Sequence, residues 1–112
     1  MKKSKSSLTL QSKHPGDRDY EREIEQYLKR EVEKAGGVCR KFASPGHRGV
    51  PDRLCIFPGG RIYFVEVKRW KGTLSPLQKH EIGILLSLGC RALVVRTTEM
   101  VDRLIQLATS HI

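Results

Sequence analysis

The chain has few aromatic side chains and no long apolar segment. Aromatic residues make up 6% of its 112 residues, and Trp70 is the single tryptophan. No segment approaches the roughly 18 consecutive apolar residues that suggest a membrane-spanning helix, so we expect no membrane partner. The first residues are basic but have neither a long apolar stretch nor a small-residue cleavage site, which argues against a secretory signal.

Cysteine is also scarce, with three widely spaced residues, Cys39, Cys55 and Cys90. An odd set with this spacing fits neither a disulfide framework nor the CxxC pattern of a zinc site. We therefore expect reduced and inert thiols, in or near the core of an intracellular protein.

Acidic residues are in the minority, with 12 Asp and Glu against 21 Lys and Arg and a formal net charge of +9. This excess favours a polyanionic partner, and nucleic acid is the leading candidate. Residues 1–13 contain four lysines and no acid. Their composition predicts a disordered basic arm over 1–16, which either contacts phosphates or is a solvated tail. Residues 17–112 have a length suited to one folded domain.

The apolar pattern predicts a mixed α/β domain with helices packed on a small sheet. Helical spacing predicts a first helix that begins near Asp17 or Asp19 and ends at Gly36, a second over 76–88, and a third from Thr98. Apolar runs predict strands over 38–43, 52–57, 61–68 and 91–97, which gives the order α-β-β-β-α-β-α. The side chains expected to be buried are Ile24, Tyr27, Leu28, Val32 and Ala35 on the first helix, Leu77, Ile82, Leu85, Leu86 and Leu88 on the second, and Val101, Leu104, Ile105 and Leu107 on the third.

Two acids and a lysine are placed together by the strand pattern. Glu66 and Lys68 are two positions apart on the central strand, so their side chains project from the same face. A turn at 58–60 would join this strand to the preceding one as a hairpin. Because equal numbers of residues separate Asp52 and Glu66 from that turn, the hairpin brings these two carboxylates together.

Neighbouring carboxylates repel each other unless a positive charge neutralises them. A hard divalent cation does so, and an all-oxygen site suits Mg²⁺ or Mn²⁺. Such a cation activates water and polarises phosphoryl oxygens, while Lys68 could orient the attacking water or stabilise developing charge. This pattern fits phosphodiester hydrolysis. The alternative is that Glu66 and Lys68 form an ordinary ion pair on a solvated strand face, and the spacing leaves both interpretations open.

Three segments, SPGHRGVPDR (44–53), PGGRIYFVEVK (58–68) and LSPLQ (74–78), together resemble the virus-type replication-repair nuclease (VRR-NUC) family of the PD-(D/E)xK superfamily. The resemblance extends from about Glu21 to Thr97. It implies a restriction-endonuclease-like α/β fold and a divalent-metal-dependent, structure-selective DNA endonuclease, with branched DNA such as four-way (Holliday) junctions as substrate. It further implies a homodimer in the cytoplasm of a bacterium or phage-infected host.

The same resemblance implies roles for individual residues. Asp52, Glu66 and the Val67 backbone carbonyl would hold Mg²⁺ or Mn²⁺, and Lys68 would assist the attacking water. Gln78 would position the active-site loop or contact DNA.

The resemblance also implies a glutamate from the first helix. At about 100° per residue, Glu21 lies about 60° and Glu25 about 100° from Ile24, so both are on or beside the apolar stripe. We favour Glu21 by its angle and keep Glu25 as the alternative.

Basic and polar residues around these acids form a candidate DNA-binding rim, which supplies affinity with little sequence readout. Trp70 either stacks on an unpaired base or covers the edge of the core. The rim candidates are Ser44, His47, Arg48, Arg53, Arg69 and Lys71.

A non-catalytic DNA-binding or architectural module is the alternative function. The presence of Asp52, Glu66 and Lys68 argues against it, because pure binding needs no acids facing phosphates. An RNA-directed nuclease is less favoured, since the sequence has no aromatic RNA-recognition motif.

Overall fold

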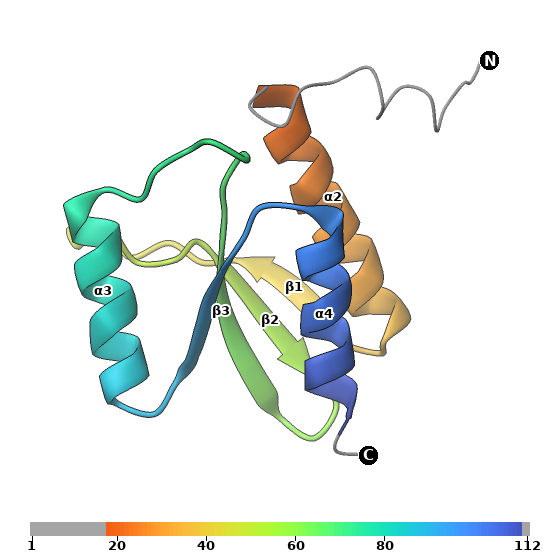
Figure 1. Ribbon diagram of the computed structural model, residues 1–112. Coiled ribbons are helices and arrows are strands. Elements are labelled where there is room, and N and C mark those ends of the chain that lie inside the picture. Colours follow the sequence, from red (N-terminus) through yellow and green to blue (C-terminus); the bar gives the residue numbers. More distant parts are fainter. Residues whose placement is uncertain (1–17, 111–112) are drawn as a thin grey trace.

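Four strands form one mixed sheet with the order β1-β2-β3-β4, and helices lie on both of its faces (Figure 1). The computed structural model describes residues 18–110. The predicted element order is confirmed: α2 (Arg18–Lys34), β1 (Val38–Lys41), β2 (Arg53–Phe57), β3 (Arg61–Val67), α3 (Pro76–Ser87), β4 (Arg91–Val95) and α4 (Thr98–Thr109).

The beginning of α2 concerns the predicted helix cap and the predicted basic arm. Asp19 is the second residue of α2, so the helix begins before it. The other candidate cap, Asp17, and the arm predicted over 1–16 lie outside the described residues. Among residues 18–110, no helix combines the length and the apolar character needed to cross a bilayer.

The first three strands pair antiparallel, and β4 pairs parallel to β3 after the crossover through α3. The β2–β3 register runs from Phe57 opposite Arg61 to Arg53 opposite Val65. A tight turn joins them, in which the Gly60 amide donates to the Phe57 carbonyl at 3.1 Å. One further step of this register places Asp52 opposite Glu66, in agreement with the predicted hairpin.

The core lies between the sheet and the pair of helices α2 and α4 (Figure 1). Ile24, Leu28 and Val32 of α2 are fully buried, so the predicted apolar stripe of this helix is confirmed. In α4 the prediction holds for Val101 and Leu104 but is wrong for Leu107, which is 56% exposed. The small side chain of Ala108 is buried in its place.

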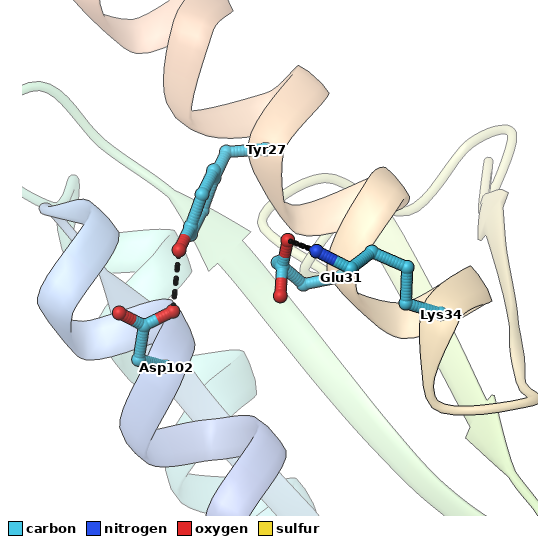
Figure 2. A network of polar contacts seen from close by, with 4 residues as sticks. All are labelled: Tyr27, Glu31, Lys34 and Asp102. Atoms are coloured by element: carbon cyan, nitrogen blue, oxygen red, sulfur yellow. Dashed lines mark hydrogen bonds and ion pairs between the residues drawn. The ribbon is translucent and has the colours of Figure 1, made fainter.

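A hydrogen bond also joins the two core helices near the surface (Figure 2). The Tyr27 hydroxyl donates to Asp102 Oδ1 at 2.6 Å, and this bond raises the pKa of Tyr27 to about 12. A hydrogen bond to a charged acceptor contributes about 1 kcal/mol at such an exposed site. The neighbouring Lys34–Glu31 pair, at 3.0 Å, lies within α2 alone. An exposed pair of this kind contributes at most a few tenths of a kcal/mol to stability.

Helix α3 lies on the opposite face of the sheet from α2 and α4 (Figure 1), and its apolar side chains are largely exposed. Leu77 is 49% exposed, Leu86 53% and Leu88 74%. The prediction that they form a buried face is therefore wrong, and Ile82 and Leu85 are only half-buried. The physical reason is that α3 packs mainly along β4, so the rest of this sheet face stays open to solvent.

The open part of this face is an apolar hollow of about 490 Å³. Phe42, Leu54, Ile62 and Phe64 line it, and the rings of Phe42 and Phe64 meet edge to face. Ile62 is 41% exposed. One face of β3 therefore belongs to the core, and the other presents apolar side chains to solvent.

The three cysteines are free thiols, as expected. Cys39 and Cys55 are opposite each other on β1 and β2, with sulfur atoms 3.9 Å apart. Both thiols are buried in the core, whereas Cys90 is only partly buried.

Candidate active site

The predicted carboxylates meet in a pocket of about 330 Å³ where β3 ends. Asp52 comes from the loop before β2, Glu66 from β3, and Gln78 from the first turn of α3. Glu66 lies on the same strand face as Ile62 and Phe64, because side chains alternate along a strand. The acids and the apolar hollow thus share one face of the sheet, while Tyr63, Val65 and Val67 face the core. The pocket is completed by Arg48, Gly49, Val50, Ser75 and Leu77.

Glu66 is held in an environment that disfavours its charge. Glu66 is only 8% exposed, and the pKa of its carboxyl is raised to about 7. Burial is the main cause, and the negative charge of Asp52 adds to it. The Lys68 ammonium acts in the opposite direction. The three residues that the strand pattern grouped therefore interact electrostatically.

This pKa predicts how stability depends on pH. A carboxyl with a raised folded-state pKa binds its proton more tightly in the folded protein. Its stabilising contribution is complete below pH 4.5 and is lost as the pH rises to about 7. In the metal-free wild type, we expect the free energy of unfolding to fall by on the order of 3 kcal/mol across this pH range because of Glu66. The Glu66→Gln variant should not show this fall.

Urea unfolding at pH 4.5, 6 and 8, with a chelator present, measures this effect. Glu33→Gln, on an exposed site of α2, is the control and should retain the wild-type slope. Equal pH slopes for wild type and Glu66→Gln would contradict the assigned environment.

Gln78 is placed by the cap of α3. Ser75 is the N-cap and Pro76 follows it, as the sequence predicts. The Ser75 hydroxyl accepts from the Gln78 amide at 3.1 Å, and Gln78 Oε1 accepts from the Ser75 amide at 2.8 Å. This reciprocal capping box fixes the glutamine side chain. Its Nε2 is then free to donate to Glu66 Oε2 at 3.3 Å, which connects the helix start to the buried acid.

The two first-helix glutamates have different surroundings. The charge of Glu21 acts on Glu66 and raises its pKa. Glu25 instead lies 3.8 Å from Arg53. Burial raises the pKa of Glu25, Arg53 partly offsets that shift, and the charges of Asp52 and Glu21 raise the pKa further. Glu25 is thus engaged with a cation on the α2 side of the sheet.

The donor set suits a small oxygen-preferring cation. In the described part of the chain, no three His, Cys, Asp or Glu side chains converge to hold a metal ion. Asp52 and Glu66 nevertheless share one pocket, and their mutual repulsion raises the pKa of Glu66. Mg²⁺ is commonly held by one or two carboxylates together with water. The residues present therefore fit Mg²⁺ or Mn²⁺ with few protein ligands.

Basic residues occur in the pocket and on the loop that follows β3. Arg48 is part of its lining, and Arg69 and Lys71 are exposed on the loop after β3. Arg96, which the sequence interpretation missed, donates to the carbonyls of Arg69 and Gly72. It ties that loop to the end of β4, and Trp70 on the loop is 45% exposed.

The structure does not bring every rim candidate to the pocket. The Arg53 side chain is only 18% exposed and faces Glu25. Ser44 lies in a turn in which its carbonyl accepts from the His47 amide at 3.0 Å. The His47 ring contacts Glu81 of α3, with Nε2 2.8 Å from Oε2.

Glu81 is a further residue that the sequence interpretation missed. It is the one residue of α3 that is buried, at 9% exposure. The sequence did contain a signal for it: Glu81 follows Gln78 by three positions, which places both on the same side of the helix.

Comparison with known proteins shows the family to which the chain belongs. No family model matches the chain. A curated relative, "Putative nuclease p44" of Acyrthosiphon pisum secondary endosymbiont phage 1, is 44% identical over 77 residues, which cover 69% of this chain and 83% of the relative. A solved structure described as a VRR_NUC domain superposes with a TM-score of 0.73 at 37% identity, covering 77% of this chain and 94% of the other. On this similarity of sequence and fold, the chain belongs to the VRR-NUC domain family.

Proposed function

We propose that this protein is a divalent-metal-dependent DNA endonuclease. The proposal rests on the buried Glu66, which shares one pocket with Asp52 and Arg48. The ammonium of Lys68, two positions further along the chain, acts on the same carboxylate and lowers its pKa. The phage relative is named as a nuclease, which supports the same reaction class. The net charge of +9 supports a polyanionic substrate.

Asp52, Glu66 and the Val67 carbonyl would hold Mg²⁺ or Mn²⁺, with Glu21 as the favoured first-helix contributor because its charge reaches Glu66. The cation supplies Lewis acidity toward the phosphate and lowers the pKa of bound water. Glu25 stays the alternative, although its contact with Arg53 makes it less available.

The other residues bind and orient the reactants. Lys68 holds a water next to the acids and, as an ammonium, offsets the negative charge that develops on the phosphate. Gln78 keeps the Glu66 carboxylate in place through its 3.3 Å hydrogen bond. Arg48, Arg69 and Lys71 contact backbone phosphates on either side of the scissile bond.

Metal removal provides the decisive test. We expect the protein to cleave DNA with Mg²⁺ or Mn²⁺, and EDTA to abolish cleavage. Duplex, flap and four-way-junction substrates should be compared in the same assay. Absence of cleavage with both metals on all substrates would refute the enzyme proposal.

The alternative function is a non-catalytic DNA-binding or architectural module. It would bind DNA equally well with and without metal and leave it intact. The buried carboxylate argues against this alternative, because keeping a charged acid out of water costs stability and needs a compensating role.

Four-way junctions are the proposed substrate, with a homodimer presenting two active sites to the two-fold junction. The apolar hollow supports a second copy as the partner, since exposed apolar patches mark association sites. Phe42, Leu54, Ile62 and Phe64 line that hollow, and it shares no residue with the active-site pocket. Such an enzyme would act inside a bacterium or a phage-infected cell.

Light scattering tests the oligomeric state. We expect the wild type to have twice the monomer mass and Ile62→Lys, in the hollow, to be a monomer with an unchanged fold. Lys79→Glu on exposed α3 changes charge outside the hollow and serves as the control. A monomeric wild type that still cuts four-way junctions would contradict the dimer proposal.

A further inference from the structure

The loop that leads to Asp52 is held at its base and at two further points on α3. At its base, the Phe42 amide donates to the Asp52 carbonyl at 2.7 Å. Further out, His47 Nε2 lies 2.8 Å from Glu81 Oε2. The intervening segment 43–51 has no strand or helix of its own. The Phe42–Asp52 hydrogen bond therefore fixes only the ends of the loop, and the contacts with α3 fix its middle.

The second anchor is a close backbone approach. Gly49 has φ +92°, and a Cβ atom built there would lie 2.6 Å from the Leu77 carbonyl oxygen. Only glycine fits against the helix at this distance. Gly46, in the same loop, also has a positive φ of 76°, but nothing lies within 4 Å of its Cβ position.

Helix α3 has little apolar burial of its own with which to fix this geometry. Most of its leucines are exposed, and Glu81 is its one buried residue. The Glu81 side chain is 12% exposed, whereas the His47 side chain is 61% exposed. A buried carboxylate requires a hydrogen-bonding partner, and His47 is the partner that the loop supplies. The contact thus supplies the buried acid of α3 with a partner from the loop.

We propose that His47 and Glu81 form a positioning pair that locks the 44–52 loop onto α3 and thereby sets the position of Asp52 and Arg48. Neither residue touches the substrate. The same helix holds Glu66 through Gln78, one turn away from Glu81. Helix α3 therefore contacts both the loop that carries Asp52 and the Glu66 side chain. This role rests on the proposed nuclease function for its catalytic consequence, but the loop anchoring itself does not.

The first experiment measures loop order without DNA or metal. Backbone ¹⁵N order parameters of Arg48 and Gly49 should be about 0.85 in the wild type and fall below about 0.6 in His47→Ala. His47→Gln, which retains a nitrogen donor for Glu81, should restore most of the order. His80→Ala removes an exposed histidine next to Glu81 and should change nothing. Unchanged order parameters in His47→Ala would overturn the proposal, whatever the protein cleaves.

The second experiment uses steady-state cleavage. We expect His47→Ala and Glu81→Leu each to lower kcat about 10- to 100-fold with little change in KM, and the double variant to be no worse than either single one. A direct DNA contact by His47 would instead raise KM, and Glu81→Leu would not reproduce it. That pattern would refute the positioning role. A wild type that cleaves nothing would refute the proposed function, while the order parameters still decide on the loop anchor.

Gly49→Ala and Gly46→Ala provide an independent matched pair. Both place a side chain at a positive φ, so both have similar backbone strain. Only Gly49→Ala collides with α3, and we expect it to lower kcat at least about tenfold more than Gly46→Ala. Equal losses in the two variants would count against the loop–helix contact as the cause.

Discussion

Replacing Asp52 with asparagine is expected to lower kcat for DNA cleavage at least about 1,000-fold. The substitution keeps the size of the side chain but removes the charge that, with Glu66, would hold the cation. Lewis-acid stabilisation of the transition state is worth several kcal/mol, and each 1.4 kcal/mol corresponds to a factor of ten. Single-turnover cleavage with Mg²⁺ or Mn²⁺ measures the loss directly.

Binding should change in the opposite direction. Removing a negative charge from a pocket that faces phosphates predicts equal or tighter DNA binding in a metal-free shift assay. Asp102→Asn is the control, because Asp102 lies on α4 and bonds to Tyr27 away from the pocket. Undiminished cleavage by Asp52→Asn would refute the site assignment.

Replacing Lys68 with methionine is expected to lower kcat about 100- to 1,000-fold, the range seen when a transition-state charge stabiliser is removed. Methionine preserves most of the apolar stem. Because the Lys68 ammonium lowers the pKa of Glu66, its loss should also raise that pKa and weaken metal binding near neutral pH.

Measuring kcat near neutral pH and at higher pH separates the effect on metal binding from the effect on the chemical step. Raising the pH to about 9 ionises Glu66 in both proteins, so a metal-binding defect disappears there and a defect in the chemical step persists. We expect the loss in kcat to persist. Lys34→Met, at a highly exposed site of α2, should behave as wild type. Full recovery of Lys68→Met at high pH would show that Lys68 acts only through Glu66.

Local sequence signals were sufficient for most of the fold. The turn at 58–60 and the equal strand lengths around it predicted the register that places Asp52 opposite Glu66. The Ser75-Pro76 pair predicted the start of α3. These features depend on backbone geometry within a few residues, which the sequence specifies directly.

Features that depend on distant elements were harder to predict. The leucines of α3 have the composition of a buried helix, yet the helix covers only the β4 side of the sheet. Arg53 looked like a rim residue by its place beside Asp52, but strand alternation turns its side chain toward α2 and Glu25. The His47–Glu81 contact joins residues 34 positions apart, and no local pattern encodes that pairing.

The mixed sheet also has consequences for the order of folding. Asp52 and Glu66 are fourteen positions apart within one antiparallel hairpin, so a short loop closure brings them together. The parallel partners Tyr63 and Arg91 are separated by the whole crossover helix, and such non-local pairing forms slowly. The acids should therefore meet early, while α3, with Gln78 and Glu81, docks late. Docking of α3 then completes an active site whose two acids the hairpin has already brought together.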